Sequence, residues 1–264
     1  MIPEQPVLCV VPARLGSQRL PEKPLRVLAG RPMIEWVWRR VAEFDALDAV
    51  VVATDSERVA EVCTRIGARV ELTAASHPSG TDRVAEVAGR AEWSEYGLIV
   101  NVQGDEPLVA ESHVAAAVEQ VRRGWDIGTV ATPIGAVAAW RDPSVVKVAR
   151  RPDGAALYFS RSPIPFLRGG EPTEAELAGG AYLRHVGIYA YSRRALEQWV
   201  ALPVGELERI ERLEQLRPLA AGMSVGVAVA SAAEGGVDTP ADAVRVEQRL
   251  REIEAGEPRA TVER

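Results

Sequence analysis

Short apolar segments alternate with helical patterns through the first half of the chain. Val7–Val11, Ala49–Ala53 and Leu98–Val102 are almost entirely apolar. Runs of this length are typical of parallel strands that are buried on both faces of a sheet. Parallel neighbours must be joined by crossovers, which are usually helices. The sequence therefore predicts an α/β fold with a doubly wound, mainly parallel sheet.

The segments between these strands have the expected helical character. Apolar residues recur at helical spacing over Met33–Phe44. Thr54 lies three residues before Glu57, which is the spacing of a capping box, and Gly67 is the expected residue just past the end of the helix that follows. The other elements predicted in this half are a strand at Val70–Leu72, helices at Thr81–Ala88 and Ser112–Arg123, and a strand at Ile127–Thr132.

The pattern changes after about residue 135. Val145–Ala149, Ala156–Phe159 and Val186–Tyr191 are predicted strands without helices between them, and the Gly- and Glu-rich segment Gly169–Gly180 is predicted to be an exposed loop. The remaining expected elements are helices at Ala195–Trp199 and Leu207–Gln215, a strand at Val225–Ala230, and a helix from Pro240 to about Glu254. We predict one domain over 1–264, with a core at about 6–134 and 220–254, an inserted mixed α/β lobe at about 135–219, and a frayed tail at 255–264.

Composition limits the class of partner. The chain has 37 acidic and 31 basic residues, a net charge of −6, which argues against binding to nucleic acid. The longest apolar runs are far shorter than the roughly 20 residues of a membrane span, so no membrane association is expected. Cys9 and Cys63 fall in predicted buried elements and are interpreted as core residues. The N-terminus has no signal-type apolar stretch, so we expect a cytoplasmic protein.

A basic loop follows the first predicted strand. Arg14, Arg19 and Lys23 lie within ten residues, and only Glu22 offsets their charge. The loop leaves the carboxyl end of the sheet, where ligands of open α/β folds bind. The loop is neither a Walker A motif nor a GxGxxG motif. Clustered cations in an acidic chain favour a polyphosphate ligand, and the alternative is a solvated basic loop.

Two acidic turns close other predicted strands. Asp105 lies in the turn NVQGDEP after Leu98–Val102, and Asp238 lies in VDTP near the C-terminus. Two carboxylates that face a phosphate loop suit metal-assisted phosphoryl chemistry with Mg²⁺. Each turn also has a structural interpretation: a tight Gly/Pro turn at Asp105, and a helix N-cap at Asp238 ahead of Pro240.

These motifs resemble a known family. PAR–x4–RLP–x–KPL, which starts at Pro12, resembles the signature of sugar nucleotidyltransferases, and VNVQGDEP with VDTPAD resembles that of the 3-deoxy-manno-octulosonate (Kdo) cytidylyltransferases, or CMP-Kdo synthetases. HPSGTDR, ALYFSR, LRHVGIY and LEQLR agree with the family motifs in the same order, and the likeness extends from about residue 6 to 250. Two departures are Glu22, where many members have Gly, and Phe166-Leu167 in place of Trp-Asp.

The resemblance implies a Rossmann-like nucleotidyltransferase fold and a reaction. CMP passes from CTP to the anomeric hydroxyl of Kdo, with Mg²⁺ as cofactor and pyrophosphate as the second product, which activates Kdo for lipopolysaccharide biosynthesis. It also implies a homodimer, for which the helix at 206–217 is the candidate interface. The alternatives are a related acceptor (8-amino-Kdo, another sugar acid or a phosphonate analogue) and a catalytically silent nucleotide-sugar-binding protein.

The same resemblance assigns residues to roles. Arg14, Lys23 and Asp105 are the expected catalytic residues, and Asp105 and Asp238 the expected metal ligands. The expected nucleotide-binding residues are Pro12, Ala13, Arg14, Arg19, Lys23, Ser79, Gly80 and Thr81. The expected sugar-acid-binding residues are Arg83, Gln103, Arg161, His185, Tyr189, Glu214 and Gln215.

The sugar-acid set also has structural interpretations. Arg83 suits a charge on a helix surface, Arg161 a structural salt bridge, and His185 a satisfied structural histidine. Glu214 and Gln215 lie in ELERIERLEQLR, a charged segment whose i, i+3 and i, i+4 pairs would stabilise a helix in any case. Its apolar stripe is predicted to be core or dimer contact and consists of Leu207, Ile210, Leu213 and Leu216. In the functional interpretation, one cleft collects the cations Arg14, Arg19, Lys23, Arg83 and Arg161.

Overall fold

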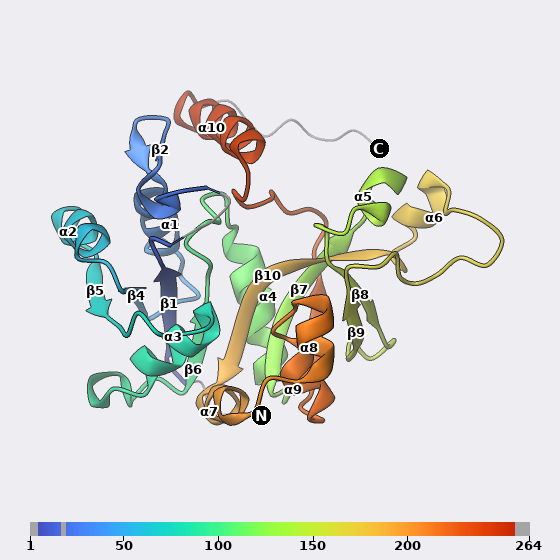
Figure 1. Cartoon of the computed structure of the whole chain (residues 1–264), viewed down its shortest axis with the longest axis horizontal. Helices are drawn as coiled ribbons and strands as arrows, with labels where there is room; N and C mark the ends of the chain where they lie inside the picture. The colour runs from blue at the N-terminus through green and yellow to red at the C-terminus, as the bar shows by residue number, and fades with distance from the viewer. Residues whose placement is uncertain (1–4, 17–19, 257–264) are drawn as a thin grey trace.

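The computed structural model describes residues 5–16 and 20–256 (Figure 1). Nine strands of this described part form one sheet, with the order β11-β7-β10-β6-β1-β4-β5 and with β8 and β9 branching from β10. The strands are β1 (Val7–Ala13), β4 (Ala49–Thr54), β5 (Arg69–Leu72), β6 (Leu98–Asn101), β7 (Ile127–Pro133), β8 (Lys147–Arg150), β9 (Ala156–Ser160), β10 (Leu183–Ser192) and β11 (Val225–Val229). A separate ribbon pairs β2 (Val27–Leu28) with β3 (Arg31–Pro32).

The predicted α/β class is confirmed, and the sheet is mixed. Strands β6, β1, β4 and β5 are parallel, and β11 is parallel to β7. Strand β10 is antiparallel to its three neighbours, β6, β7 and β8. The interval 135–219, which we predicted to be an inserted lobe, therefore contains a central strand of the main sheet. That part of the boundary was wrong because β10 pairs with strands that lie far from it in sequence.

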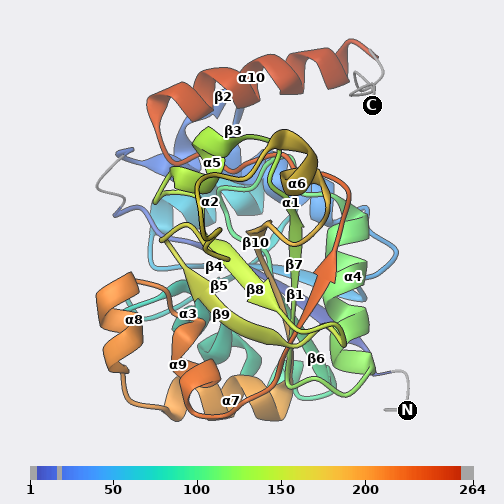
Figure 2. The ribbon, with the colours of Figure 1, turned by 90° about the vertical axis from the view of Figure 1, so that its right-hand side faces the viewer.

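Helices cover both faces of the sheet (Figures 1 and 2). Strand β1 alternates between two cores: Val7, Cys9 and Val11 pack with α1, α2 and α4, whereas Leu8 and Val10 pack with α3, α7 and α9. This double burial is the physical reason for the continuous apolar run. The helices are α1 (Met33–Val41), α2 (Glu57–Arg65), α3 (Gly80–Ala88), α4 (Glu111–Arg122), α5 (Val137–Arg141), α6 (Glu174–Ala178), α7 (Arg193–Ala201), α8 (Glu206–Glu211), α9 (Leu216–Ala220) and α10 (Pro240–Glu254), with 3₁₀ turns η1 (Lys23–Leu25) and η2 (Ala91–Trp93).

The segment Gly169–Gly180, predicted to be an exposed loop, contains the short helix α6. Thr173 and Glu176 form a reciprocal capping box at its start. Leu177 is completely buried in a small cluster with Trp140 and Tyr182. Figure 1 shows α5 and α6 together at one end of the molecule. The prediction was wrong because Leu177 lies in a stretch dominated by Gly and Glu, and Trp140, which it packs against, is distant in sequence.

Of the predicted helix over Leu207–Gln215, only the part up to Glu211 is helical, within α8. Arg212 adopts a left-handed conformation, with φ of 52°, and ends α8. Leu213 is buried, and α9 begins only at Leu216. Leu207 and Ile210 remain 41% and 71% exposed on α8. The charge pattern favours a helix locally, but the break allows Leu213 to enter the main core.

The two ends of α2 and the two cysteines were each predicted from single residues. Ser56, rather than Thr54, caps α2, and Gly67 has the positive φ of a residue just past a helix end. Cys9 and Cys63 are buried and unpaired, as predicted.

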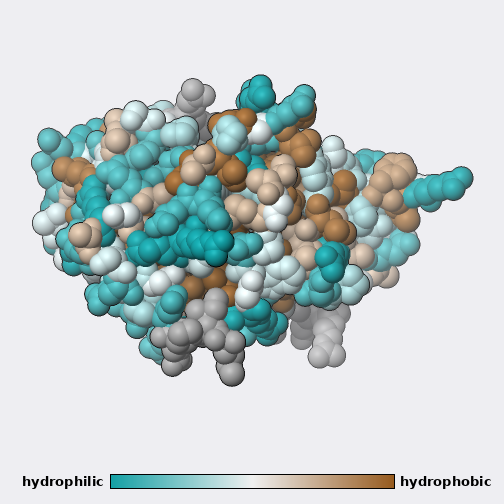
Figure 3. Space-filling model, turned by 90° about the horizontal axis from the view of Figure 1, so that it is seen from below, coloured by the Kyte–Doolittle hydropathy of each residue, from teal (hydrophilic) through white to brown (hydrophobic). Residues whose placement is uncertain are grey.

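Within the described ranges, none of the helices combines the length and apolar character that crossing a bilayer requires. The face seen in Figure 3 is a mosaic of hydrophilic and hydrophobic residues.

Candidate active site

The carboxyl ends of β1 and β6 meet at one edge of the sheet. Strand β1 is parallel to β6, and Val102 donates its N–H to the carbonyl of Val10 at 3.3 Å. Beyond this bond, a Cβ on Gly104 would lie 2.8 Å from the carbonyl oxygen of Pro12, closer than side chains tolerate. The glycine in the GDEP turn thus lets Asp105 approach the start of the basic loop.

Lys23 joins the two carboxylates that were predicted to bind a metal. Its ammonium donates to Asp105 and, at 2.9 Å, to Oδ1 of Asp238. A further bond at 2.9 Å, from the Val237 N–H to the Asp105 carbonyl, holds the two acidic turns together. Asp238 is not the helix N-cap, because Thr239 caps α10. The structure therefore contradicts the N-cap interpretation of Asp238.

The residue before Lys23 explains a departure from the family pattern. Glu22 has φ of 52° and ψ of 31°, a left-handed conformation in which glycine has no steric cost. Its carboxylate pairs with Arg58 of α2 across the surface. The left-handed backbone at this position suits the glycine of many family members, and Glu22 adopts the same conformation here.

The charges in this cluster shift one another's protonation. Burial lowers the pKa of Lys23, but Asp105 and Asp238 together raise it by more, so the ammonium stays charged. Burial, followed by the charge of Asp105, raises the pKa of Glu106 to about 8. Sequence reasoning did not single out Glu106. The available signal was its position beside Asp105, although its proximity to Arg184 of β10 depends on the fold.

The N-terminus of α3 lies against the same edge. A Cβ on Gly80 would sit 3.4 Å from Pro12 and 3.5 Å from the side-chain oxygen of Gln103. Ser79 caps α3 by accepting from the Asp82 N–H at 3.2 Å. The structure thus brings Gly80 next to Pro12, and both are predicted nucleotide-binding residues.

Several residues of the predicted sugar-acid set form a second, adjoining group. Thr81 donates to Oε2 of Glu214 at 3.1 Å, and burial raises the pKa of Glu214. The Glu214 charge in turn helps to raise the pKa of buried Tyr189, after burial and Tyr191. The ring of His185 lies 5.3 Å from that of Tyr189, and burial lowers its pKa to about 3. Gln215 is buried at the start of α9.

Arg83 and Arg161 have other partners. Arg83 is buried, pairs with Asp55 at 3.2 Å and donates to Thr73, so it is not a surface charge. Arg161 donates to three backbone carbonyls, those of Pro143, Glu211 and Arg212. The Arg161 guanidinium is therefore held by backbone carbonyls instead of the carboxylate that the predicted salt bridge requires.

Of the five cations that were predicted to share one cleft, Arg83 and Arg161 are held by partners within the protein. The partners of Arg83, Asp55 and Thr73, directly follow β4 and β5, whereas Arg161 directly follows β9. Lys23 is in the site, and Arg14 is exposed at the end of β1. Arg19 and the tail residues 257–264 lie outside the described residues.

Comparison with known proteins shows the family of this chain. A cytidylyltransferase family model matches residues 8–225. The chain is 53% identical over 241 residues to the 3-deoxy-manno-octulosonate cytidylyltransferase of Gemmatimonas aurantiaca, covering 91% of this chain and 92% of the relative. The chain belongs to the 3-deoxy-manno-octulosonate cytidylyltransferase family. The relative with the same description in Syntrophotalea carbinolica is 44% identical over 249 residues, covering 93% and 98% of the two chains.

Solved structures agree with this family assignment. A CMP:2-keto-3-deoxy-manno-octonic acid synthetase in complex with CTP superposes with a TM-score of 0.85 and 38% identity, over 94% of this chain and 100% of that one. The 4-diphosphocytidyl-2C-methyl-D-erythritol synthase of Anaerococcus prevotii has a TM-score of 0.61 at 11% identity, over 94% and 99%, and shares the fold alone. The enzyme is therefore a nucleotidyltransferase with a mixed α/β fold.

Proposed function

We propose that this enzyme transfers CMP from CTP to the anomeric hydroxyl of Kdo and releases pyrophosphate. The observation that carries the proposal is the joining of Lys23, Asp105 and Asp238 at the carboxyl edge of the sheet, in a chain that shares 53% identity with a 3-deoxy-manno-octulosonate cytidylyltransferase. The hydroxyl oxygen of Kdo bonds to the α-phosphorus of CTP. The bond from that phosphorus to the oxygen it shares with the β-phosphate breaks, and the hydroxyl proton passes to water.

The two carboxylates fit Mg²⁺ as a cofactor. Mg²⁺ is usually held by one or two carboxylates together with substrate phosphates. The described residues contain no group of three His, Cys, Asp or Glu side chains that could hold a metal ion by themselves. Asp105 and Asp238 nevertheless converge on one cationic atom, the Lys23 ammonium, so they can share a cation. When bound there, Mg²⁺ would neutralise phosphate charge.

The side chains of this enzyme supply the remaining functions. Lys23 stabilises the phosphates together with Arg14 and Arg19, and a metal ion on the carboxylates would free the Lys23 ammonium for this role. Ser79, Gly80 and Thr81 bind the nucleoside next to the β1 loop. The sugar acid is held by Gln103, His185, Tyr189, Glu214 and Gln215, with Arg83 and Arg161 contributing if they exchange their present partners for the substrate carboxylate.

The assay is pyrophosphate release from CTP with and without Kdo. We expect release that depends on Kdo, and comparison with 8-amino-Kdo and other sugar acids identifies the preferred acceptor. Lys23→Ala and Asp105→Asn should each lower kcat by about 10²–10³-fold, as for loss of one electrostatic contact with the reacting group. Asp153→Asn, at an exposed pair with Arg151, is the control. Kdo-independent release, or full activity in the Asp105 variant, would refute the proposal.

We also propose a homodimer formed through α8 and β9. Ile210 on α8 is 71% exposed and Leu157 on β9 is 57% exposed. Glu211 at the end of α8 accepts from the Ser160 hydroxyl at the end of β9 at 2.6 Å, so these elements adjoin. Ile210→Glu should convert a dimer to a monomer in light scattering, whereas Val244→Glu on α10 should leave it unchanged. A monomeric wild-type protein contradicts this proposal.

The cytoplasmic location remains a prediction.

A further inference from the structure

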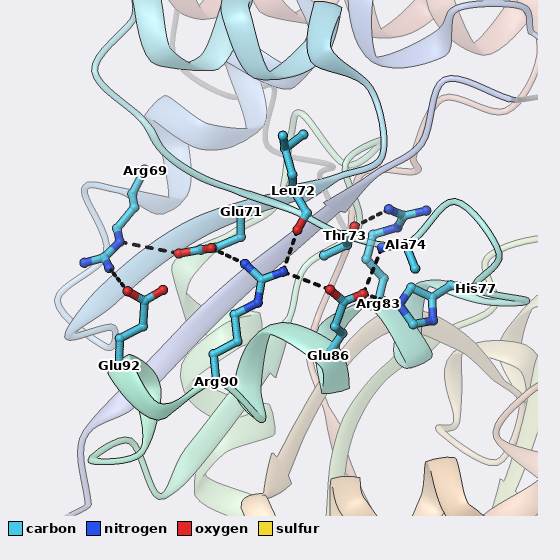
Figure 4. Close-up of polar contacts among 10 residues, drawn as sticks. All are labelled: Arg69, Glu71, Leu72, Thr73, Ala74, His77, Arg83, Glu86, Arg90 and Glu92. Atoms are coloured by element: carbon cyan, nitrogen blue, oxygen red, sulfur yellow. Dashed lines mark hydrogen bonds and ion pairs between the residues drawn. The ribbon is translucent and has the colours of Figure 1, made fainter.

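The loop between β5 and α3 is fastened to the side of the helix that follows it (Figure 4). The carboxylate of Glu86, on α3, accepts from the backbone N–H of Ala74 at 2.9 Å and contacts Nε2 of His77 at 2.5 Å. A carboxylate can only accept, so Nε2 of His77 must carry the proton in this bond. One side chain thus holds the loop at two points, three residues apart.

Two arginines of the same region support this attachment (Figure 4). Arg90 donates to the other oxygen of Glu86 at 2.8 Å and to the carbonyl of Leu72 at 2.5 Å. Arg83 donates to the hydroxyl of Thr73. Every residue from Leu72 to Ala74 therefore has a side-chain or backbone bond to a residue on α3 or just after it.

The partners of Glu86 favour its ionised form. Burial by itself raises the pKa of Glu86, but the Ala74 N–H, His77 and Arg90 outweigh it and lower this pKa to about 2. The Glu86 side chain is 29% exposed and that of His77 is 19% exposed, so water competes only partly for these bonds. The Glu86 carboxylate is therefore a charged acceptor for the Ala74 N–H and for Arg90 near neutral pH.

The loop leads directly to residues next to the proposed reaction site. His77 lies two residues before Ser79, which caps α3, and Gly80 packs on Pro12 at the end of β1. We propose that Glu86 is a positioning residue for the nucleotide, acting through His77 on Ser79, Gly80 and Thr81. Glu86 itself is on the outer part of α3 and is not assigned a contact with either substrate. The inference rests on the proposed function, because that function assigns the nucleoside to these three residues.

The test compares Glu86→Gln with Glu92→Gln. Glu92 belongs to the same surface network but pairs with Arg69, away from the loop (Figure 4). We expect Glu86→Gln to weaken CTP binding, measured by calorimetry without Kdo, and to raise the KM for CTP, each by about tenfold. The kcat and the KM for Kdo should stay within about twofold of the wild type. Glu92→Gln should change none of these values.

His77→Ala provides a second variant that removes the other side of the attachment. It should reproduce the selective loss of CTP affinity even if Glu86→Gln fails to fold. An unchanged affinity for CTP in both variants would overturn the inference. A purely structural role would also overturn it, and its signs would be a lowered melting temperature, a lowered kcat and equal rises in the KM for CTP and the KM for Kdo. A wild-type protein that binds CTP but shows no Kdo-dependent release refutes the proposed acceptor, while the CTP measurements still decide the role of Glu86.

Discussion

Removing one partner of the buried Glu208–Arg217 pair should destabilise the enzyme strongly. Arg217 on α9 donates from Nε and Nη2 to the two oxygens of Glu208 on α8, at 2.7 and 2.6 Å. The Glu208 side chain is only 10% exposed and the Arg217 side chain only 6% exposed. The pair connects two helices across the turn that carries Glu214 and Gln215, so it also supports part of the proposed sugar-acid site.

The magnitude follows from the cost of an unpaired buried charge. Breaking such a pair costs about 3–5 kcal/mol, because the remaining ion loses its partner but stays away from water. The slight exposure of both side chains favours the lower end, about 3 kcal/mol, for Arg217→Met. For a chain of this length that corresponds to a fall in melting temperature of roughly 6–10 °C. The double variant Glu208→Leu/Arg217→Met removes both charges and should recover most of this loss.

The measurement is a double-mutant cycle in urea, followed by circular dichroism. Glu208→Leu, Arg217→Met and the double variant are compared with the wild type, and the control is Arg123→Met, whose pair with Glu119 is exposed. The reasoning is wrong if Arg217→Met costs less than about 1 kcal/mol. It is also wrong if the double variant loses as much as the two single variants added together, since that result means no coupling between the two charges.

Three further predictions concern other parts of the molecule. Gly104→Ala should lower kcat by about tenfold or more, because its Cβ would meet the Pro12 carbonyl at 2.8 Å and displace the site, whereas Gly135→Ala, with open space around it, should not. Leu177→Ala should cost about 2–5 kcal/mol in urea unfolding, and an unchanged stability would show that α6 is not anchored by this residue. Burial lowers the pKa of His185 in the folded protein to about 3, so below about pH 6.5 the unfolded chain binds a proton that the folded chain does not. The free energy of unfolding should therefore fall between pH 6.5 and pH 3. His185→Gln should make this fall smaller.

Local patterns predicted the framework of the fold well. Strands β1, β4 and β6 have runs of apolar residues because side chains on both faces enter a core, and this requirement is written into consecutive positions. The helix α10 was predicted from Pro240, since proline suits the first turn of a helix. Capping was predicted less well: Ser56 and Thr239 compete with neighbours of similar chemistry, and the backbone geometry decides between them.

Where the predictions failed, the deciding contacts come from distant parts of the chain. Strand β10 is apolar enough for a core strand, but its place between β6 and β7 depends on pairing across many residues. Leu177 was hidden among Gly and Glu, and Arg212 breaks a segment whose charges favour a continuous helix. In each case tertiary packing outweighs a weak local preference.

The sequence by itself determined the fold class, the buried strands and the motifs that identify the family, because each depends on residues close together in the chain. Only the folded molecule revealed that Lys23 lies between Asp105 and Asp238, and that Glu106 is drawn into the same cluster. It also assigned Arg83 and Arg161 to partners that no motif indicates. Charge pairing depends on distance and burial, and both are properties of the three-dimensional arrangement.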